Sequence, residues 1–153
     1  MMRKCPVCGE GKLAGGQVER RVKVGRHTFV AAVPARVCDA CGEGLVSYAR
    51  AKELELGVAA QLAAIGDASA AAFKYMRKTL AMRATDLAEL LGVTPETVSR
   101  WETGRVPVDR RALASLAALV RDTRAGSTAT LDHLRALAHP PRAPREIAIR
   151  LAV

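Results

Sequence analysis

Apolar positions recur at helical spacing in the middle of the chain, and the recurrences are separated by residues that end or begin helices. Within residues 84–104, a first apolar stripe stops at Gly92, which tolerates the left-handed turn that closes a helix. Thr94 then offers an N-cap oxygen, and Pro95 takes the first helical position, where it loses no hydrogen bond. The two stripes consist of Leu87, Ala88 and Leu91, then Val98 and Trp101. Two short helices joined by a turn that contains glycine are the helix-turn-helix signature.

The same spacing predicts helices on both sides of this motif. A helix around Phe73–Leu80 precedes it, and Asp109 can cap another that follows, so residues 71–121 are expected to form a compact all-α domain. Upstream, Ser47 can cap a helix that ends near Gly66. The apolar stripe of that helix needs a partner. The sequence leaves this partner open among the N-terminal module, the helical domain and a second copy of the chain.

Alternation with a period of two replaces the helical pattern near the N-terminus. Val18–Val24 alternates in part, Gly25 and Arg26 can turn, and residues 27–37 are rich in Val, Thr and Phe. This pattern predicts a β-hairpin or a small three-stranded sheet.

The C-terminal part follows a break of small residues at 123–130. A short helix is expected near Leu131–Leu137, and two prolines then end it. Residues 140–153 are expected to lack regular structure, or else to add a strand to another sheet or to a partner. The second alternative is based on alternating apolar residues, Ile147, Ile149 and Leu151. Two histidines show no ligand spacing and are expected to be exposed, His133 and His139.

Composition agrees with a mostly helical chain that binds a polyanion. Half of the 153 residues are apolar and only 3% are aromatic, and Ala and Leu, which favour helices, dominate. The formal net charge of +9 suits nucleic acid, although charge also serves solubility alone. No apolar run approaches the ~18 residues of a membrane span, and no signal-peptide core follows Lys4. We therefore expect a cytoplasmic protein, in which paired thiols more often bind metal than form disulfides.

The cysteines form two matching C-x-x-C knuckles, CPVCGEG at 5–11 and CDACGEG at 38–44. The glycine after each second cysteine allows a tight turn that can aim amide hydrogens at the sulfurs. Four thiolates suit one structural Zn²⁺ with a closed tetrahedral shell, and the predicted ligands are Cys5, Cys8, Cys38 and Cys41. A disulfide pair, a redox C-x-x-C motif and iron–sulfur ligation are the alternatives. His27 is expected to be a surface strand residue, because the cysteines already fill the site.

These elements predict an α+β fold that is mostly α, in which a helix joins a small N-terminal zinc-bound β module to an all-α helix-turn-helix domain. The expected order is the zinc module, the connecting helix and linker, the helix-turn-helix domain, and the C-terminal helix and tail. Their bounds are 1–46, 47–70, 71–121 and 122–153.

The segment GVTPETVSRWETGRVPV at 92–108, preceded by DLAELL, resembles the Cro/C1-type (XRE-type) helix-turn-helix family. With two C-x-x-C-G knuckles in front of such a domain, the chain is similar to the MqsA (YgiT-type) antitoxins of bacterial toxin–antitoxin pairs. One departure lies at the start of the domain's second helix. Family members often have a Ser or Thr cap there, followed by a Gln that touches a phosphate. Here the matching positions are Arg83 and Ala84, so Arg83 or Thr85 would have to replace that contact.

In helix-turn-helix proteins, the second helix of the motif enters the major groove with its N-terminal part on the base edges. Arg100 can then present two donors to guanine. Glu96 either accepts from a cytosine amino group or only stabilises the helix N-terminus. Arg105 suits a phosphate contact. Trp101 is expected in the core, and Glu102 is expected to pair with a nearby arginine. The predicted DNA-binding residues are Thr94, Glu96, Thr97, Arg100 and Arg105.

The resemblance implies the antitoxin of a type II toxin–antitoxin system, which neutralises a small ribonuclease toxin by direct binding and represses its own operon. The expected partners are this toxin and a palindromic double-stranded DNA operator. A homodimer is expected, because two half-sites about 34 Å apart require two-fold symmetry. The alternative is a stand-alone zinc-containing regulator without a toxin. A thiol enzyme belongs to a third class, but the sequence shows no other catalytic constellation, and we expect no enzymatic activity.

Overall fold

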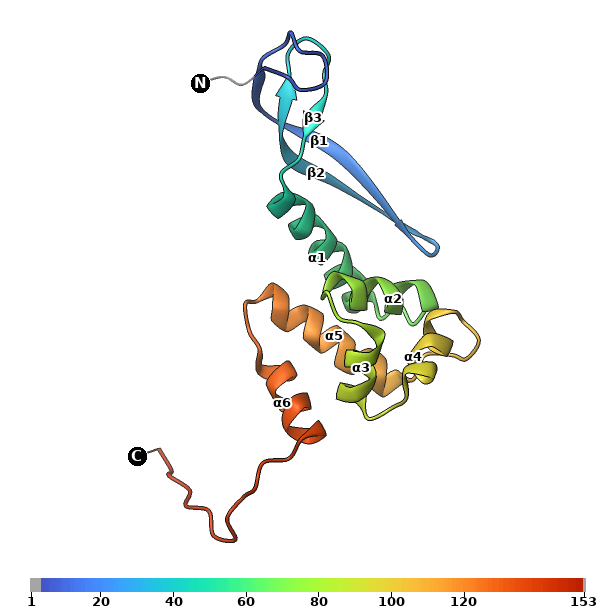
Figure 1. Cartoon of the computed structure of the whole chain (residues 1–153), viewed down its shortest axis with the longest axis vertical. Helices are drawn as coiled ribbons and strands as arrows, with labels where there is room; N and C mark the ends of the chain where they lie inside the picture. The colour runs from blue at the N-terminus through green and yellow to red at the C-terminus, as the bar shows by residue number, and fades with distance from the viewer. Residues whose placement is uncertain (1–3, 153) are drawn as a thin grey trace.

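The computed structural model of the chain describes residues 4–152. A narrow β-sheet forms one end of the molecule, a cluster of helices forms the other, and the C-terminal segment projects away from both (Figure 1). All three strands precede the six helices in the described part of the chain. The α+β, mostly α fold class is confirmed.

The sheet is antiparallel, and its strands follow the chain order β1-β2-β3. The strands are β1 (Leu13–Val24), β2 (His27–Cys38) and β3 (Gly44–Leu45). The three-stranded alternative is therefore correct. β1 begins before Val18, the residue at which the alternation in the sequence starts. Glycine in this first part of β1 lets the strand approach β2 closely. A Cβ on Gly16 would stand only 2.9 Å from the Cγ2 atom of Val37 on β2.

The helical cluster contains the four helices expected around the turn motif. They are α2 (Ala70–Thr79), α3 (Ala84–Leu91), α4 (Pro95–Glu102) and α5 (Arg110–Arg124). Phe73 and Trp101 meet edge to face in their shared core, with ring centroids 5.6 Å apart. Trp101 is only 6% exposed, which confirms it as a core residue.

α1 (Tyr48–Ile65) joins the sheet to this cluster, and its apolar stripe packs within the chain. The hydroxyl of Ser47 accepts a hydrogen bond from the Arg50 amide at 3.3 Å, and Gly66 closes the helix with φ 65°. Val58 and Leu62 are buried where α1 contacts α5, α2 and β2. The stripe therefore has both the helical cluster and the hairpin as its partners.

The turn end of the β1–β2 hairpin belongs to the same hydrophobic core as the helices. Val24 is buried in that core, and Val22 and Phe29 pack against it. At the turn, a Cβ on Gly25 would stand 3.6 Å from the hydroxyl oxygen of Ser69, just before α2. The opposite end of the hairpin carries the cysteines, so one ribbon joins two cores. The four-part division of the chain remains a proposal, and it has to accommodate this contact.

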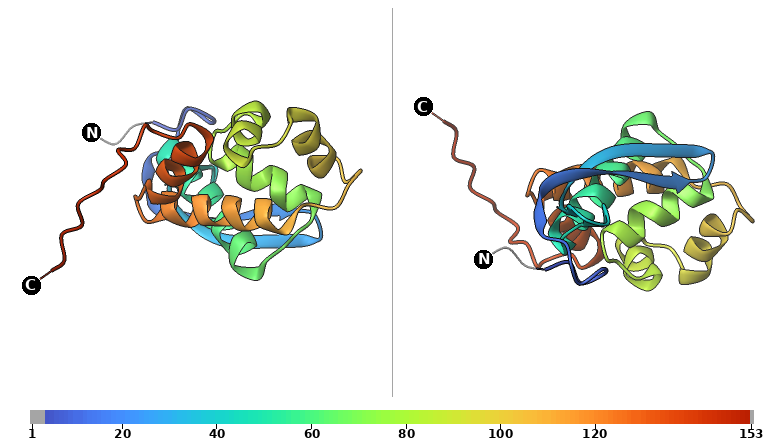
Figure 2. Two further views of the ribbon diagram at one scale, coloured as in Figure 1. Left: turned by 90° about the horizontal axis from the view of Figure 1, so that it is seen from below. Right: turned by 90° about the horizontal axis from the view of Figure 1, so that it is seen from above.

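α6 (Ala129–Ala138) lies outside the cluster, against α3 and α5, and none of its residues is buried. His133 and His139 are exposed, as expected, and His139 Nε2 lies 2.7 Å from Glu89 Oε1 on α3. Residues 140–152 contain no helix or strand and extend away from the body (Figure 2). Across residues 4–152, no helix combines the length and apolar character needed to cross a membrane.

Candidate metal centre and helix-turn-helix surface

The two knuckles have the same backbone design. Gly9 and Gly42 follow the second cysteine of each and adopt left-handed φ angles of 74° and 72°. Their amides donate to the carbonyls of Cys5 and Cys38, at 2.9 and 3.0 Å. Only glycine adopts this conformation without strain. The predicted tight turn after each second cysteine is therefore present twice.

The four cysteine sulfurs converge, and all lie within 4.8 Å of one another. The Cys5–Cys41 and Cys8–Cys38 sulfurs are 3.8 and 3.7 Å apart. A disulfide requires about 2.05 Å, whereas four ligands about 2.3 Å from a tetrahedral Zn²⁺ stand about 3.8 Å apart. The sulfur positions therefore fit one four-coordinate metal ion, with each of these close pairs joining one knuckle to the other.

The backbone approaches the sulfur cluster closely at Gly11. A Cβ on Gly11 would lie 2.2 Å from the Cys38 sulfur, so a side chain at this position would displace the cluster. Cys5 and Cys38 are buried with Leu13 in a small core of their own, while Cys41 is exposed.

Backbone amides and crowded sulfurs change the acidity of the thiols. The amide N–H groups of Gly11 and Glu10 lower the pKa of Cys8 to about 6. The Glu43 amide acts in the same direction on Cys41, but the neighbouring sulfurs and desolvation raise the pKa of that thiol to about 12. Four thiols this close cannot all ionise unless a cation balances their charge. A divalent metal ion would supply that balance.

His27 does not join this cluster. It lies beside the hairpin turn, opposite Val24, at the far end of the sheet from the cysteines. Its Nε2 atom stands 3.4 Å from a carboxylate oxygen of Asp67, in the connection between α1 and α2. His27 is therefore a strand residue outside the metal site, as expected, but it is half-buried rather than fully at the surface.

The turn between α3 and α4 has the expected geometry. Gly92 adopts φ 65° and ends α3, and the Val93 amide donates to the carbonyl of Ala88 at 3.0 Å. Thr94 caps α4 by accepting from the Thr97 amide at 3.3 Å. Both helices are therefore fixed by bonds between residues close in sequence.

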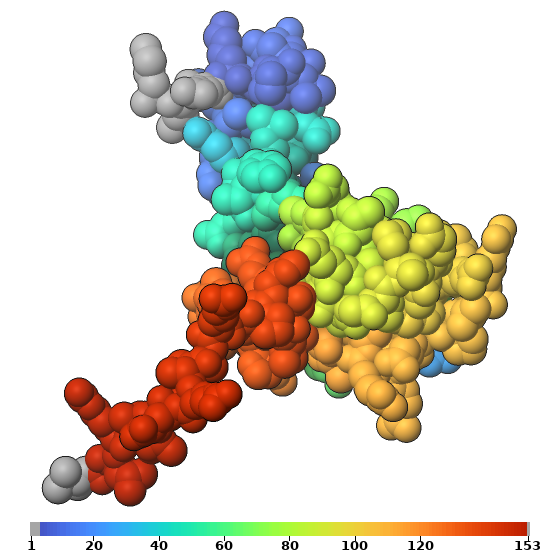
Figure 3. Space-filling view, turned by 60° about the horizontal axis from the view of Figure 1, so that its bottom comes forward, coloured from blue at the N-terminus to red at the C-terminus, as the bar shows by residue number. Residues whose placement is uncertain are grey.

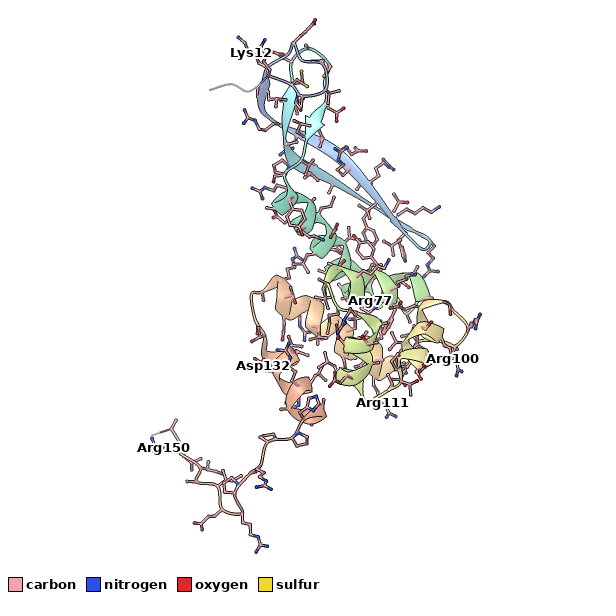
Figure 4. The ribbon with its side chains drawn as sticks, viewed as in Figure 1. Lys12, Arg77, Arg100, Arg111, Asp132 and Arg150 are labelled. Atoms are coloured by element: carbon pink, nitrogen blue, oxygen red, sulfur yellow. The ribbon has the colours of Figure 1, made fainter. Side chains whose placement is uncertain are left out.

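The side chains predicted to contact DNA lie at the N-cap of α4, on α4 and in the loop after it. Glu96 and Arg100 are exposed, while Thr97 is half-buried and its hydroxyl lies 3.0 Å from that of Thr94. Figure 4 shows Arg100 extending outward from α4. The Arg105 amide donates to the Arg100 carbonyl at 3.0 Å, so the two arginines lie in adjoining segments. Their contact with DNA remains a prediction.

A buried ion pair connects α4 to α2. Arg77 on α2 donates from Nη2 to Glu102 at 2.9 Å and from Nη1 to the Met82 carbonyl at 2.6 Å. Its side chain and that of Glu102 are 10% and 8% exposed, and the carboxylate raises the pKa of Arg77. The expectation that Glu102 pairs with an arginine is confirmed. The identity of that arginine was not predicted, since 25 residues separate the two.

Arg83 takes the cap position of α3 without the usual hydroxyl. Its backbone amide and guanidinium both donate to Asp86, at 3.2 Å and at 2.8–3.0 Å. The Asp86 carboxylate raises the pKa of Arg83, and the guanidinium lowers that of Asp86. The Arg83 guanidinium is therefore already bonded to Asp86. Thr85, the other residue considered for the phosphate contact, is exposed.

The fold and these two sites define a class: a helix-turn-helix protein with a four-cysteine module placed before the motif. Within that class, the chain matches the family described as the antitoxin component of bacterial toxin–antitoxin systems, MqsA, over residues 2–124. Because this match covers most of the chain, the protein belongs to the MqsA antitoxin family, which confirms the resemblance seen in the sequence. The match ends with α5, so α6 and the tail lie beyond it. No curated protein matches the sequence.

Proposed function

We propose that the protein is the antitoxin of a type II toxin–antitoxin system. It neutralises a small ribonuclease toxin by direct binding, represses its own operon in the cytoplasm, and acts without catalysis. The observation that carries this proposal is the MqsA family match over residues 2–124, which spans both the knuckles and the helix-turn-helix. The toxin binds the cysteine module and α1.

In this proposal, α4 reads a palindromic operator as part of a homodimer. Arg100 donates to guanine, and Glu96 and Thr97 lie on the same outer side of α4. Thr94 and Arg105 bind phosphates and position the helix. The exposure of Arg100 and its backbone link to the Arg105 segment support this division of roles.

The four cysteines hold one structural Zn²⁺ in this proposal. The convergence of all four sulfurs, with separations of 3.7 and 3.8 Å between the knuckles, supports a bound cation. A four-thiolate site leaves no open coordination position, so the ion stabilises the fold and takes no part in a reaction. The closed site also argues against a thiol enzyme.

Co-expression with the adjacent open reading frame, followed by a pull-down, tests the toxin half of the proposal. We expect a stoichiometric complex with a small basic ribonuclease whose toxicity the complex relieves. If the protein binds its operator but no neighbouring gene product, it is a stand-alone regulator.

Fluorescence anisotropy with DNA from upstream of the gene tests the other half. We expect a preference for this fragment over random DNA of equal length, and a change in affinity when toxin is added. Equal affinity for both DNAs would exclude operator recognition. Equal affinity with and without toxin would exclude coupling between the two partners.

A further inference from the structure

The C-terminal tail exposes a strip of large apolar side chains. Ile147, Ile149 and Leu151 are 66%, 81% and 84% exposed. In an extended chain, alternate positions point to the same side, so these three residues form one apolar edge. Exposed apolar surface gathered in this way marks a contact site rather than ordinary solvated surface.

A groove of about 820 Å³ opens where this tail leaves the body. Its walls are α3, α5, α6 and the α2–α3 connection, and Pro141 at the start of the tail forms part of its rim. The lining is mostly apolar and includes Leu80, Met82, Leu90 and Leu131. The groove is within the size range of protein pockets that hold organic groups.

Groove and tail carry opposite charge. The groove has more acidic than basic side chains: Asp86, Glu89 and Asp122 against Arg135. The tail has the reverse balance: Arg142, Arg145 and Arg150 against Glu146. Asp86 already pairs with Arg83 and Glu89 with His139, so Asp122, whose carboxylate accepts from the Thr130 amide, is the acidic group that a basic segment would meet. Opposite charges of this kind favour association and set its direction.

The link between groove and tail carries the tail away from its own groove. Pro140, Pro141 and Pro144 lie in this link, and closely spaced prolines favour a stiff, extended chain. Figure 3 shows the tail projecting from the α6 side of the molecule, clear of the neighbouring surface. A stiff link of this kind brings the tail to a second molecule more readily than back to its own.

We propose that two copies of the chain exchange tails. Residues 144–152 of each copy lie in the groove beside α3 and α6 of the other, with their apolar edge inward and their arginines at the acidic rim. This inference rests on the homodimer of the proposed function and names its contact. A reciprocal exchange has two-fold symmetry, which is the symmetry that a palindromic operator requires.

Light scattering after size-exclusion chromatography of the full-length protein tests the exchange. We expect wild type to be a dimer and the double variant Ile147→Asp, Ile149→Asp to dissociate. Its dimer dissociation constant should rise by at least about tenfold, because two buried apolar side chains become charged. Ile65→Asp is the matched control, since Ile65 is 54% exposed at the end of α1 and does not line the groove. A double variant as dimeric as wild type, or a control that dissociates equally, would overturn the proposal.

Photo-crosslinking shows which copy the tail occupies. A benzophenone amino acid is placed at position 149, and the protein is mixed with isotope-labelled copies. We expect crosslinks to α3 or α6 that join labelled with unlabelled chains. Crosslinks confined to one chain, or lying outside the groove, contradict the exchange.

Operator binding is measured on the same samples. If the tail variants stay dimeric and still bind the operator with preference, only the exchange is refuted. A tail-exchanged dimer without operator preference refutes only the proposed DNA role.

Discussion

Arg77 occupies a position where the helical repeat alone would place an apolar side chain, and its guanidinium reaches from α2 to the last turn of α4. Only the folded chain reveals this role, because the carboxylate that neutralises Arg77 belongs to a different helix. Trp101 and the cysteines are different: helical spacing predicts the burial of Trp101, and the repeated C-x-x-C-G motif predicts one four-sulfur site even though its two halves are far apart in sequence. At the residue scale, chemistry was predictable where a periodicity or a repeated motif indicates it, and unpredictable where folding alone brings two partners together.

Replacing Arg77 with Met should destabilise the protein by about 3–5 kcal/mol, because it leaves the Glu102 carboxylate buried without a cation. The free energy of unfolding in urea, followed by circular dichroism, measures this loss. Changing Glu102 to Met in the same chain should recover most of it, since replacing both members of a buried pair is often nearly neutral. A single variant as stable as wild type would show that the pair does not hold α4.

Arg100→Ala and Arg105→Ala form a matched pair of tests for the proposed DNA surface. Arg100→Ala should remove about 1–3 kcal/mol of discrimination between operator and random DNA, because it removes a base contact. Arg105→Ala should weaken both complexes alike and lower the salt dependence by about one phosphate contact. Anisotropy titrations at several salt concentrations separate these outcomes. Unchanged specificity in Arg100→Ala would contradict the proposed reading helix.

At the scale of elements, helix boundaries followed the sequence closely because caps are local. Gly66, Gly92, Thr94 and Asp109 each end or begin a helix where the spacing predicted. The start of β1 was not predicted, because the length of a strand depends on the residues of the neighbouring strand. Gly16 weakens the local signal for a strand, yet the close approach to Val37 is what makes glycine suitable there.

Asp109 should make α5 sensitive to acid. The amides of Ala112 and Arg111 donate to its carboxylate and hold its pKa below the usual value. A lowered folded-state pKa gives stability that is present above about pH 4 and is lost as pH falls through the folded value. Asp109→Asn keeps a capping oxygen but does not titrate, so its unfolding free energy should fall less between pH 7 and pH 3. Glu146→Gln in the tail is the control, and an acid slope shared by all three proteins would contradict the prediction.

At the scale of the whole molecule, the order of parts was predictable and their packing was not. The sequence left the partner of the α1 stripe open, because an apolar face does not specify what covers it. The structure supplies two partners at once, the helices and the turn end of the hairpin. The contact with the hairpin joins the cysteine-bearing sheet to the helices, two regions that the sequence motifs place in separate parts of the chain.

Removal of the metal should unfold the cysteine end first. Structural zinc contributes about 10–16 kcal/mol in finger peptides, and the core around Cys5, Cys38 and Leu13 is small. After chelation, hydrogen exchange should accelerate in the knuckles and the adjoining strand ends, while α2–α5 stay protected. Cys38→Ser should likewise lower the zinc-to-protein ratio from about one and leave binding to operator DNA intact. If DNA binding disappears with the metal, the two ends do not fold separately.

Two strands, β1 and β2, run from one core to the other, and α1 packs beside β2 with its buried residues in the helical core. A single linker would let the two ends swivel, whereas a two-stranded ribbon with a helix packed along it resists bending. Strands of 12 residues set its length at roughly 40 Å. The ribbon therefore fixes the separation between the sulfur cluster and the helices. A displacement of the cysteine end would reach the helical end as a rotation of the whole ribbon.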